Sequence, residues 1–361
     1  MREKELYTVR FTPYRKKLGA ICARQTKGYS LKSHDGRYRF YVDGVASPDD
    51  ASSNSKSRKP KPPRETDFWV VQGKGLRGEQ THFVGRENTI LLTTEPSSVL
   101  IYPEEYVSQF GMICTCQPNT FHMNKVLAPP VLPWFIGYKE GSRKGVPEIT
   151  LDYDTLSSSP IPRKTKLLSV ITSNKAFTQG HIDRLRFVKI LKEHYGDSID
   201  VFGHGFRSVD DKWEALAPYK YHIVIENSSE PYYWTEKLSD CMLAGAFPLY
   251  YGCTNLEDYI PRECYEPIDI KQPEQAIHII DNAIENNLWE QRQEAIRESK
   301  LIMLDIYNMF ERIASLCDKL DYACPKERVT LQPCYSWESI TNLWRYAVGR
   351  RYYELKWKLF G

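Results

Sequence analysis

Residues 219–252 read YKYHIVIENSSEPYYWTEKLSDCMLAGAFPLYYG and determine the fold class that we predict. The apolar run YHIVIEN is typical of a buried strand, TEKLSDCMLAG of a helix that ends at a glycine, and FPLYYG of a second buried strand. The same alternation begins after Lys166 with LLSVITSN, IDRLRFVKILKEHYG and IDVFG. Strands that alternate with helices predict an α/β domain whose parallel sheet is covered by helices on both faces.

The loops at one end of this predicted sheet are the expected ligand site. Parallel sheets of this kind bind ligands at the carboxyl ends of their strands. The loops after Asn174, Gly203, Asn227 and Gly252 follow predicted strands, so we expect them to share one rim. The loop after Asn227 contains SSEPYYW (228–234), which leads directly into the next predicted helix.

Length and composition narrow the class of protein. A chain of 361 residues exceeds one ordinary core and predicts two domains. The net charge of +3, from 49 basic and 46 acidic residues, is too balanced to suggest a nucleic-acid partner. We find no apolar run of membrane-spanning length, and MREKELYTVRF lacks the apolar segment of a signal peptide. We therefore expect a cytoplasmic protein whose nine cysteines are reduced thiols.

Changes in composition along the chain predict the domain boundaries. We expect an N-terminal, acceptor-side domain over 1–150, in which the Ser-, Lys- and Pro-rich segment 46–65 is a mobile loop. Residues 151–166 are polar and contain prolines, which indicates an interdomain linker. A ligand-binding domain then covers 167–325, and 326–361 form a basic, aromatic helical tail.

The tail has two interpretations. Its tryptophans and tyrosines are interleaved with lysines and arginines in NLWRYAVGRRYYELKWKLFG, a composition suited to an anionic membrane surface. The alternative is a closing helix that packs on the first domain. We favour a peripheral contact with the inner face of a membrane.

Basic residues near two predicted helix starts are candidate phosphate ligands. Arg184 and Arg186 lie near the start of the helix after LLSVITSN, and a helix N-terminus favours anions. Thr235 can cap the next rim helix, which places Lys237 in its first turn, where a cation opposes the helix dipole. A bound diphosphate would compensate this placement. A Glu236–Lys237 ion pair is the alternative, although adjacent helix residues do not face each other.

Other rim residues are further candidates for contacts with a ligand. Tyr233 or Trp234 could stack on a base or a sugar, or could instead bridge the two domains. The loop FGHGFR (202–207) follows a strand, and its two glycines allow the backbone to approach a ligand closely. His204 and Arg207 are its candidate donor-contacting residues, and His204 suits a structural role equally well.

Glu95 is a candidate general base. It ends an apolar run in TTEPSS and precedes a proline, which restricts its backbone and directs it to a rim. A carboxylate held there could take a proton from a hydroxyl group. It could equally cap the next turn, and the residues alone leave both roles open.

Two motifs favour less specific interpretations. Gly73, Gly75 and Gly78 form a GxGxxG, and Glu95 lies at a suitable distance for a dinucleotide fold. However, the following segment EQTHFVGREN lacks helical periodicity, so we predict an ordinary glycine turn. Cys114, Cys116 and His122 could bind zinc, but their spacing is not that of a common zinc motif.

Asp152-Tyr153-Asp154 is a DxD, an arrangement that can hold a divalent metal on a nucleotide diphosphate. This DxD lies in the predicted linker, where solvated carboxylates are the simpler interpretation. A metal-dependent transferase that uses Asp152 and Asp154 remains an alternative function.

The donor half of the chain resembles glycosyltransferase family 10, the α-1,3/1,4-fucosyltransferases and their bacterial relatives. The resemblance rests on KLLSVITSN, RLRFVKIL and VFGHGFR, and above all on ENS followed by YWTEK and FPLYYG. TTEPSS, FGMICTCQ and PWFIG resemble the acceptor-domain segment of the family more loosely. The resemblance implies a GT-B architecture, in which two Rossmann-like domains face each other across a cleft.

The resemblance also implies site residues. It implies that Arg184 and Lys237 hold the diphosphate of the donor. Asn227, Tyr233 and Glu236 would contact the donor as well.

The implied reaction is an inverting transfer of fucose from GDP-fucose to a glycan hydroxyl, with Glu95 as the general base. The acceptor would be a surface polysaccharide or another glycoconjugate. We expect no cofactor apart from the donor substrate, and no divalent metal. The alternatives are a metal-dependent transferase with another nucleotide sugar and a non-catalytic module that binds a nucleotide sugar.

Overall fold

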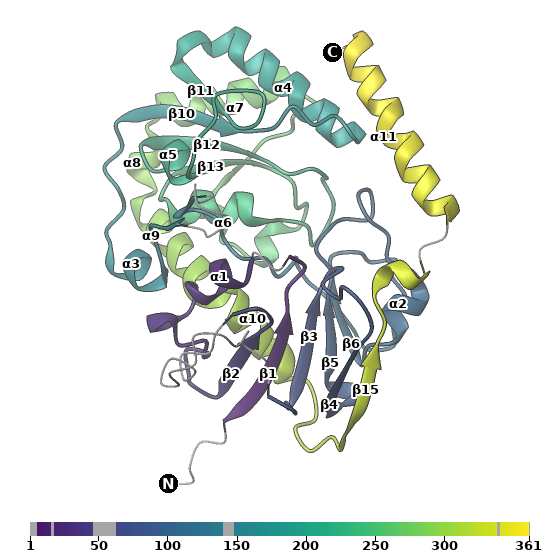
Figure 1. The fold of residues 1–361 in the computed structure, drawn as a ribbon. Coiled ribbons are helices and arrows are strands. Elements are labelled where there is room, and N and C mark those ends of the chain that lie inside the picture. The colour runs from purple at the N-terminus through teal and green to yellow at the C-terminus, as the bar shows by residue number, and fades with distance from the viewer. Residues whose placement is uncertain (1–5, 16–17, 46–62, 140–147, 338–339, 361) are drawn as a thin grey trace. The chain divides into compact units, whose positions relative to one another are not determined.

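The computed structural model in Figure 1 describes residues 6–15, 18–45, 63–139, 148–337 and 340–360. The chain forms two compact units. The first unit contains residues 1–133, 140–158 and 305–338, and the second contains 134–139, 159–304 and 339–361. The expected loop over 46–65 falls largely on residues 46–62, outside the described residues.

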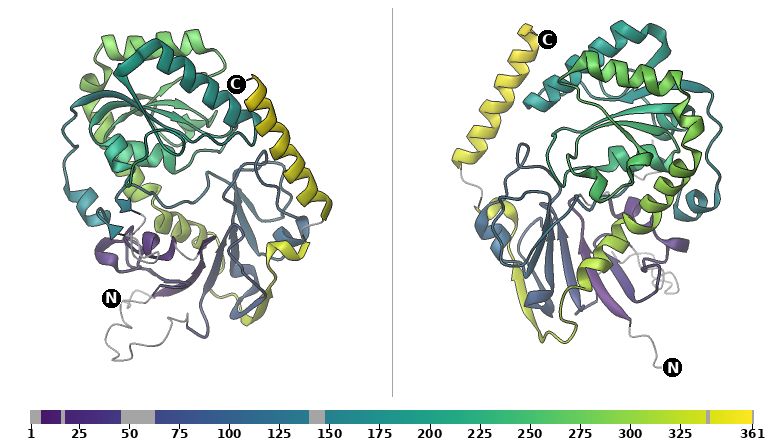
Figure 2. Two further views of the ribbon diagram at one scale, coloured as in Figure 1. Left: turned by 45° about the horizontal axis from the view of Figure 1, so that its top comes forward. Right: turned by 180° about the vertical axis from the view of Figure 1, so that it is seen from behind.

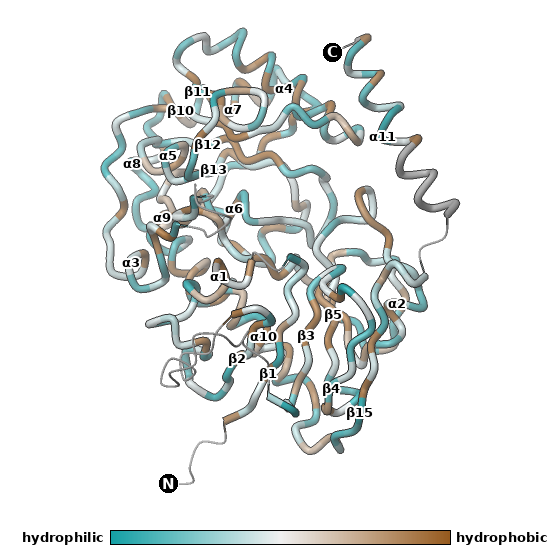
Figure 3. Tube along the Cα trace, viewed as in Figure 1, coloured by the Kyte–Doolittle hydropathy of each residue, from teal (hydrophilic) through white to brown (hydrophobic). Residues whose placement is uncertain are grey.

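The first unit is built around a six-stranded parallel sheet in the order β2-β1-β3-β5-β6-β7. Its strands are β1 (Tyr7–Thr12), β2 (Tyr38–Val42), β3 (Phe68–Gln72), β5 (Thr89–Leu92), β6 (Met112–Thr115) and β7 (Lys125–Leu127). The helices of this unit are α1 (Leu18–Ala23), α2 (Glu104–Ser108), α3 (Tyr153–Ser158) and α10 (Met309–Cys317), and it also contains the short strand β9 (Glu148–Ile149). Hydrophobic residues cover much of β3 and β5 (Figure 3), and both strands are buried throughout.

The second unit is built around a five-stranded parallel sheet in the order β11-β10-β12-β13-β14. Its strands are β10 (Lys166–Ile171), β11 (Ile199–Phe202), β12 (Tyr219–Ile225), β13 (Phe247–Tyr251) and β14 (Glu266–Pro267), with β8 (Tyr138–Lys139) on a separate segment. Its helices are α4 (Gln179–Tyr195), α5 (Trp213–Leu216), α6 (Glu236–Leu243), α7 (Pro273–Glu285), α8 (Leu288–Gln291), α9 (Gln293–Leu301) and α11 (Ile340–Phe360), and a π-helical turn covers Ile302–Ile306.

The period of two along β12 explains why helices cover both faces of this sheet. Ile223 and Ile225 point to the face where they join a core with Phe187 of α4 and Ile280 of α7. His222 points to the opposite face, where its neighbour Ser169 hydrogen-bonds to α5. Figure 2 shows α4 and α7 together on one side of the sheet. The predicted strand–helix alternation and the two-unit α/β fold class with parallel sheets are therefore confirmed.

The chain does not divide at the predicted positions. Residues 305–338 belong to the first unit, although we assigned 167–325 to the second domain. The aromatic ring of Phe310 explains this, because it packs against Phe11 of β1 and Phe40 of β2. Within the predicted linker, Tyr153–Ser158 form α3 of the first unit.

The predicted helical tail begins with a strand. β15 (Lys326–Leu331) pairs antiparallel with β4 (Gln80–Gly85) in the first unit. Val329 and Leu331 are both 0% exposed, and this alternation of buried positions is the signal for a strand. The basic, aromatic composition of the following residues concealed it. The helix of the tail is α11, which belongs to the second unit.

Helix α11 contacts α4, as all views in Figures 1 and 2 show. Tyr353 and Trp357 pack against a buried group that includes Ile182 and Leu185, and Lys356 Nζ donates to Gln179 Oε1 over 2.9 Å. The closing-helix interpretation therefore applies to the second unit and not to the first. Among the described residues, no helix combines the length and hydropathy required to cross a bilayer.

Candidate active site

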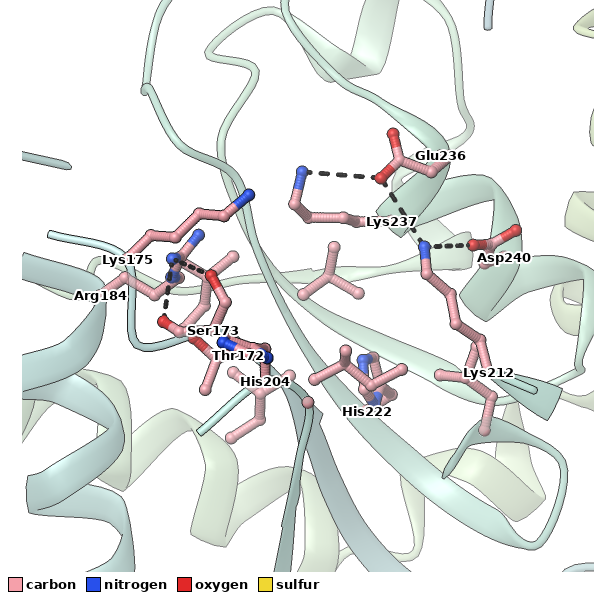
Figure 4. Close-up of a pocket in the computed structure, with 16 residues that line it drawn as sticks. Thr172, Ser173, Lys175, Arg184, His204, Lys212, His222, Glu236, Lys237 and Asp240 are labelled. Atoms are coloured by element: carbon pink, nitrogen blue, oxygen red, sulfur yellow. Dashed lines mark hydrogen bonds and ion pairs between the residues drawn. The ribbon is translucent and has the colours of Figure 1, made fainter. Parts of the chain in front are cut away.

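The second unit contains a cavity of about 370 Å³ at the carboxyl ends of β10 and β12. Its walls come from these strands, from the loops that follow β10 and β11, and from α4, α5, α6 and the residue before α5. Four cationic side chains line it, namely Lys175, Arg184, Lys212 and Lys237 (Figure 4). Two carboxylates line it as well, those of Glu236 and Asp240. The excess of cations favours an anionic ligand.

Arg184 is held in place by polar partners inside the protein. The side chain of Thr178 caps α4 and accepts a hydrogen bond from the backbone N–H of His181, so Arg184 lies in the second turn of the helix. Nη1 of Arg184 donates to Asn227 Oδ1 over 2.6 Å, and Nη2 donates to the Ser173 carbonyl over 3.3 Å. Burial lowers the pKa of Arg184 to about 10, so the side chain is still a cation at neutral pH.

One polar group of Arg184 has no partner among the described residues. Its Nε is buried and has no hydrogen-bond partner among the described residues. Asn227 orients the guanidinium, and it is held near the start of α4 because Gly180 leaves room for the Asn227 carbonyl; a Cβ at position 180 would clash with that oxygen. The structure thus brings Arg184 and Asn227 together, although Asn227 itself does not line the cavity.

Lys237 has a compensating charge that the sequence analysis missed. Its Nζ donates to Glu226 Oε2 over 3.0 Å and to Thr235 Oγ1 over 3.0 Å. Glu226 is 0% exposed and also accepts hydrogen bonds from the backbone N–H and the hydroxyl of Thr235. A diphosphate is therefore not needed to compensate the cation at the start of α6. The Glu236–Lys237 pair that we considered is longer, at 4.0 Å.

The sequence around Glu226 contains a pattern from which its ion pair could have been predicted. It ends the apolar run HIVIE on a strand that is otherwise buried, so its carboxylate had to find a cation nearby. Lys237 keeps part of its side chain accessible to the cavity, at 26% exposure. Lys237 therefore pairs with a buried carboxylate and is also partly exposed to the cavity.

Lys212 forms a second network on the other side of the cavity. Its Nζ lies 2.8 Å from Asp240 Oδ2 and 3.6 Å from Glu236 Oε1. The other oxygen of Asp240 accepts from the backbone N–H groups of Phe135 and Ile136 over 2.7 and 3.2 Å. Asp240 thus fixes residues 134–139 to the second unit and orients Lys212. The sequence analysis did not identify either residue.

Glu236 lies between the two lysines at the start of α6. Burial acts to raise the pKa of its carboxyl group, but the charges of Lys237 and Lys212 outweigh this effect and lower the pKa to about 2. The carboxylate is therefore ionised wherever the protein is folded near neutral pH, so it is an acceptor and not a proton donor.

This lowered pKa predicts a specific pH dependence of stability. Because the pKa of Glu236 is lower in the folded than in the unfolded state, its contribution is present above about pH 4.5 and is lost as the pH falls toward 2. The difference in unfolding free energy between wild type and Glu236→Gln should shrink by about 2 kcal/mol between about pH 6 and pH 3. Urea titrations across this range measure the difference. Parallel curves for the two proteins would contradict the lowered pKa.

Lys175 differs from the other three cations. It follows β10, is exposed, and has no carboxylate within ion-pair distance among the described residues. In Figure 4 its ammonium group and that of Lys237 point toward the same space. Two ammonium groups that converge on a space without a carboxylate between them indicate where an anion binds.

Tyr233, a candidate for stacking on a ligand, is buried away from the cavity. It is 1% exposed and does not line the cavity, so stacking on a ligand would require the loop to open. Trp234 is similarly enclosed, at 5% exposure.

Of the two candidate residues in the loop after β11, only one lines the cavity. His204 lines the cavity. Arg207 does not, since it lies 3.5 Å from Asp200 and over the ring of Phe202. Arg186 is exposed on α4 and also lies outside the cavity wall.

Glu95 belongs to the first unit, just after β5. Its carbonyl oxygen accepts hydrogen bonds from Gln117 Nε2 over 2.8 Å and from Cys116 Sγ over 3.6 Å. The residue is half-buried, and its backbone is thus fixed at the carboxyl end of a parallel strand.

The DxD serves local structure in the first unit. Asp152 Oδ1 accepts from the backbone N–H of Thr155 at the start of α3, and Asp154 Oδ2 accepts from the backbone N–H of Gly28. Each carboxylate therefore has a structural partner.

The zinc and dinucleotide motifs do not form sites. His122 Nδ1 accepts a hydrogen bond from the backbone N–H of Asn124, and its Nε2 lies 2.9 Å from the Phe110 carbonyl. The described part of the chain holds no metal-binding group of three His, Cys, Asp or Glu residues. The GxGxxG of Gly73, Gly75 and Gly78 leads into strand β4 and not into a helix. It is the glycine turn that we predicted.

The fold and the cavity define a class, an α/β unit with a cationic ligand site at the carboxyl ends of parallel strands. Comparison with known proteins finds a similar family for part of the chain. Residues 161–294 match the family described as "Glycosyltransferase family 10 (fucosyltransferase) C-term". These residues contain every side chain that lines the cavity. The cavity of the second unit thus lies within a segment that is similar to glycosyltransferase family 10.

Curated relatives agree with this assignment. Alpha-(1,3)-fucosyltransferase 4 of Bos taurus is 30% identical over 157 residues, which are 40% of this chain and 38% of that protein. A 4-galactosyl-N-acetylglucosaminide 3-alpha-L-fucosyltransferase 9 of Rattus norvegicus is 28% identical over 150 residues, 39% of this chain and 40% of that protein. The matched region thus spans about two fifths of these relatives. A solved structure of an alpha1,3-fucosyltransferase with GDP is 15% identical and covers 81% of this chain and 82% of that chain, with a TM-score of 0.45.

Proposed function

We propose that this protein is an inverting glycosyltransferase that transfers fucose from GDP-fucose to a hydroxyl group of a glycan. The observation that carries the proposal is the cation-lined cavity within the segment that matches glycosyltransferase family 10. Relatives that share this segment are named as fucosyltransferases. A surface polysaccharide or another glycoconjugate is the proposed acceptor.

The diphosphate of the donor lies between Lys175, Arg184 and Lys237 in this proposal. Lys175 supplies a cation without a carboxylate partner among the described residues, and Arg184 supplies a buried Nε–H without an acceptor. Lys237 is anchored by Glu226 and Thr235 and keeps its third N–H donor for a ligand. Fixed donors of this kind stabilise the charge that develops on a departing diphosphate.

The proposed chemical step is a single displacement. Glu95 takes the proton of the acceptor hydroxyl, whose oxygen then attacks the anomeric carbon from the face opposite the diphosphate. The bond between the sugar and the diphosphate breaks, and GDP leaves with the electron pair. Lys175, Arg184 and Lys237 neutralise GDP, so we propose that no divalent metal is required.

The first test is a transfer assay in EDTA. GDP release from GDP-fucose should depend on an acceptor glycan, and mass spectrometry should find one fucose added to the acceptor. The anomeric configuration of the product, read by NMR, tests inversion. Activity that appears only after a divalent metal is restored would overturn the metal-independent mechanism.

Lys175→Ala tests the diphosphate site with little risk to the fold. It should weaken GDP binding about tenfold, because a hydrogen bond to a charged group contributes about 1.5 kcal/mol. Stability should change little, since the side chain is exposed. Arg186→Ala is the matched control, an exposed cation near the same helix start but outside the cavity. Equal affinities of Lys175→Ala and wild type, measured by calorimetry, would remove Lys175 from the site.

We also propose that α11 makes a peripheral contact with the inner, cytoplasmic face of a membrane. Val348, Tyr352, Leu355 and Leu359 are exposed, and their spacing places them on one face of the helix. The exposed side chains of Arg351 and Lys358 lie among them in sequence, a combination that suits anionic lipid. Sedimentation with anionic but not with neutral vesicles is the expected result.

A further inference from the structure

The floor of the cavity contains polar groups that the proposed diphosphate contacts do not use. His222 of β12 and Thr172 after β10 both line the cavity, and they are 4% and 5% exposed. Thr172 Oγ1 is buried and has no hydrogen-bond partner among the described residues. A buried hydroxyl without a partner destabilises the fold, so a ligand that hydrogen-bonds to it is the simplest explanation.

A chain of hydrogen bonds fixes the tautomer of His222. The Ser169 hydroxyl donates to the Ala215 carbonyl over 2.8 Å, so its oxygen is left to accept. His222 Nδ1 lies 2.7 Å from that oxygen and must therefore carry the proton that it donates. Burial lowers the pKa of His222 to about 3, and the charge of Lys212 lowers it further. The ring is therefore neutral, and Nε2 is a hydrogen-bond acceptor.

No described residue donates a hydrogen bond to Nε2 of His222. The hydrogen bond to Ser169 is the one hydrogen bond of the His222 ring within the described structure, and it uses Nδ1. Because His222 lines the cavity, Nε2 is the ring atom left for a ligand (Figure 4). The floor therefore offers one obligatory acceptor, Nε2, and one hydroxyl that can donate or accept, that of Thr172.

The side chains around this floor are apolar. Ile171, Leu216 and Val224 line the same part of the second unit, from β10, α5 and β12. A sugar ring carries hydroxyl groups on several sides and would leave most of them without partners against such walls. A flat heterocycle has apolar faces and confines its polar atoms to an edge, so it suits apolar walls above two polar atoms.

We propose that His222 and Thr172 determine the specificity of the donor site for its nucleobase. His222 Nε2 accepts a hydrogen bond from a ring N–H of the base, and the Thr172 hydroxyl donates to a neighbouring carbonyl oxygen. Guanine and hypoxanthine present this pair as N1–H and O6. Uracil presents the same pair as N3–H and O4. Adenine in the same orientation presents the reverse pair, an amino donor and a ring nitrogen acceptor, so these two contacts select against adenine. This inference rests on the proposed GDP-fucose function and names the residues that recognise the base.

Calorimetric titrations with GDP, IDP and ADP test the proposal. Wild type should bind GDP and IDP within about tenfold of each other and ADP much more weakly. Thr172→Val, which removes the hydroxyl and conserves the shape, should weaken GDP about tenfold. His222→Phe should weaken GDP more and reduce the preference for GDP over ADP. His222→Gln, whose amide oxygen can accept, should recover part of that preference. Thr330→Val on the exposed surface of β15 is the control and should bind GDP like wild type.

The outcomes separate this inference from the proposed function. If wild type binds no GDP, the GDP-fucose function itself fails. If wild type binds GDP and both floor variants bind it equally well, the base contacts are wrong. If the variants keep their affinity for GDP but lose affinity for GDP-fucose, the floor recognises the sugar, and the proposal is overturned. An equal loss for GDP, ADP and pyrophosphate would show a structural effect and overturn it as well.

Discussion

Glu95→Gln is expected to reduce the turnover number about 10²–10⁴-fold, because the amide cannot accept the proton of the acceptor hydroxyl. The affinity for GDP should be unchanged, since Glu95 belongs to the first unit and the cavity to the second. The substitution keeps the shape of the side chain, and the hydrogen bonds to the backbone oxygen of residue 95 do not involve the carboxylate. Turnover at saturating GDP-fucose and calorimetry with GDP provide the two measurements.

Glu104→Gln is the matched control, an exposed glutamate of α2 in the same unit. It should have wild-type turnover. Near-normal turnover of Glu95→Gln would rule out its role as the base. A parallel loss of GDP affinity in Glu95→Gln would instead indicate that the substitution disturbs the donor site.

Glu226→Leu is expected to lower the free energy of unfolding by about 3–5 kcal/mol. Glu226 is 0% exposed, and its loss would leave the Lys237 ammonium without its carboxylate partner and the Thr235 backbone N–H without its acceptor. Removal of one member of a buried ion pair is costly because the other charge stays desolvated. Urea unfolding measures the change.

The double variant Glu226→Leu/Lys237→Met provides the control. It removes both charges, so it should recover a substantial part of the stability that the single variant loses. It should still bind GDP more weakly than wild type, because Lys237 is absent. If Glu226→Leu were as stable as wild type, the ion pair would not be a structural element of the site.

The parts of the fold that depend on local patterns could be predicted from the sequence. The strands and helices from β10 to β13 were predictable because buried parallel strands are short apolar runs and their helices are amphipathic. Residues 326–331 were not recognised, because the partner strand β4 lies more than 200 positions away in the sequence. The boundary after 304 was missed for a similar reason, since Phe310 packs on β1 and β2 at the other end of the chain.

The same distinction applies to the site. Arg184 and Lys237 were predictable because each lies at a helix start on the rim. Glu226 was not, since its pairing with Lys237 bridges a loop whose conformation includes the left-handed backbone of Tyr232. Lys212 and Asp240 come together from two different elements. His222 was hidden in an apolar run, and the unpaired Thr172 hydroxyl can be recognised only in three dimensions.

The affinity of the wild-type protein for nucleotides in EDTA is the most direct measurement, made by thermal shift with GDP, UDP, CMP and ADP. A ligand at 100 times its dissociation constant adds about 2.7 kcal/mol of stability, which is easily measured. Stabilisation by GDP without metal, and its loss in Arg184→Ala, is the predicted result. Stabilisation by UDP or CMP in place of GDP, or by no nucleotide until a divalent metal is restored, would contradict a metal-independent GDP-fucose site in the second unit.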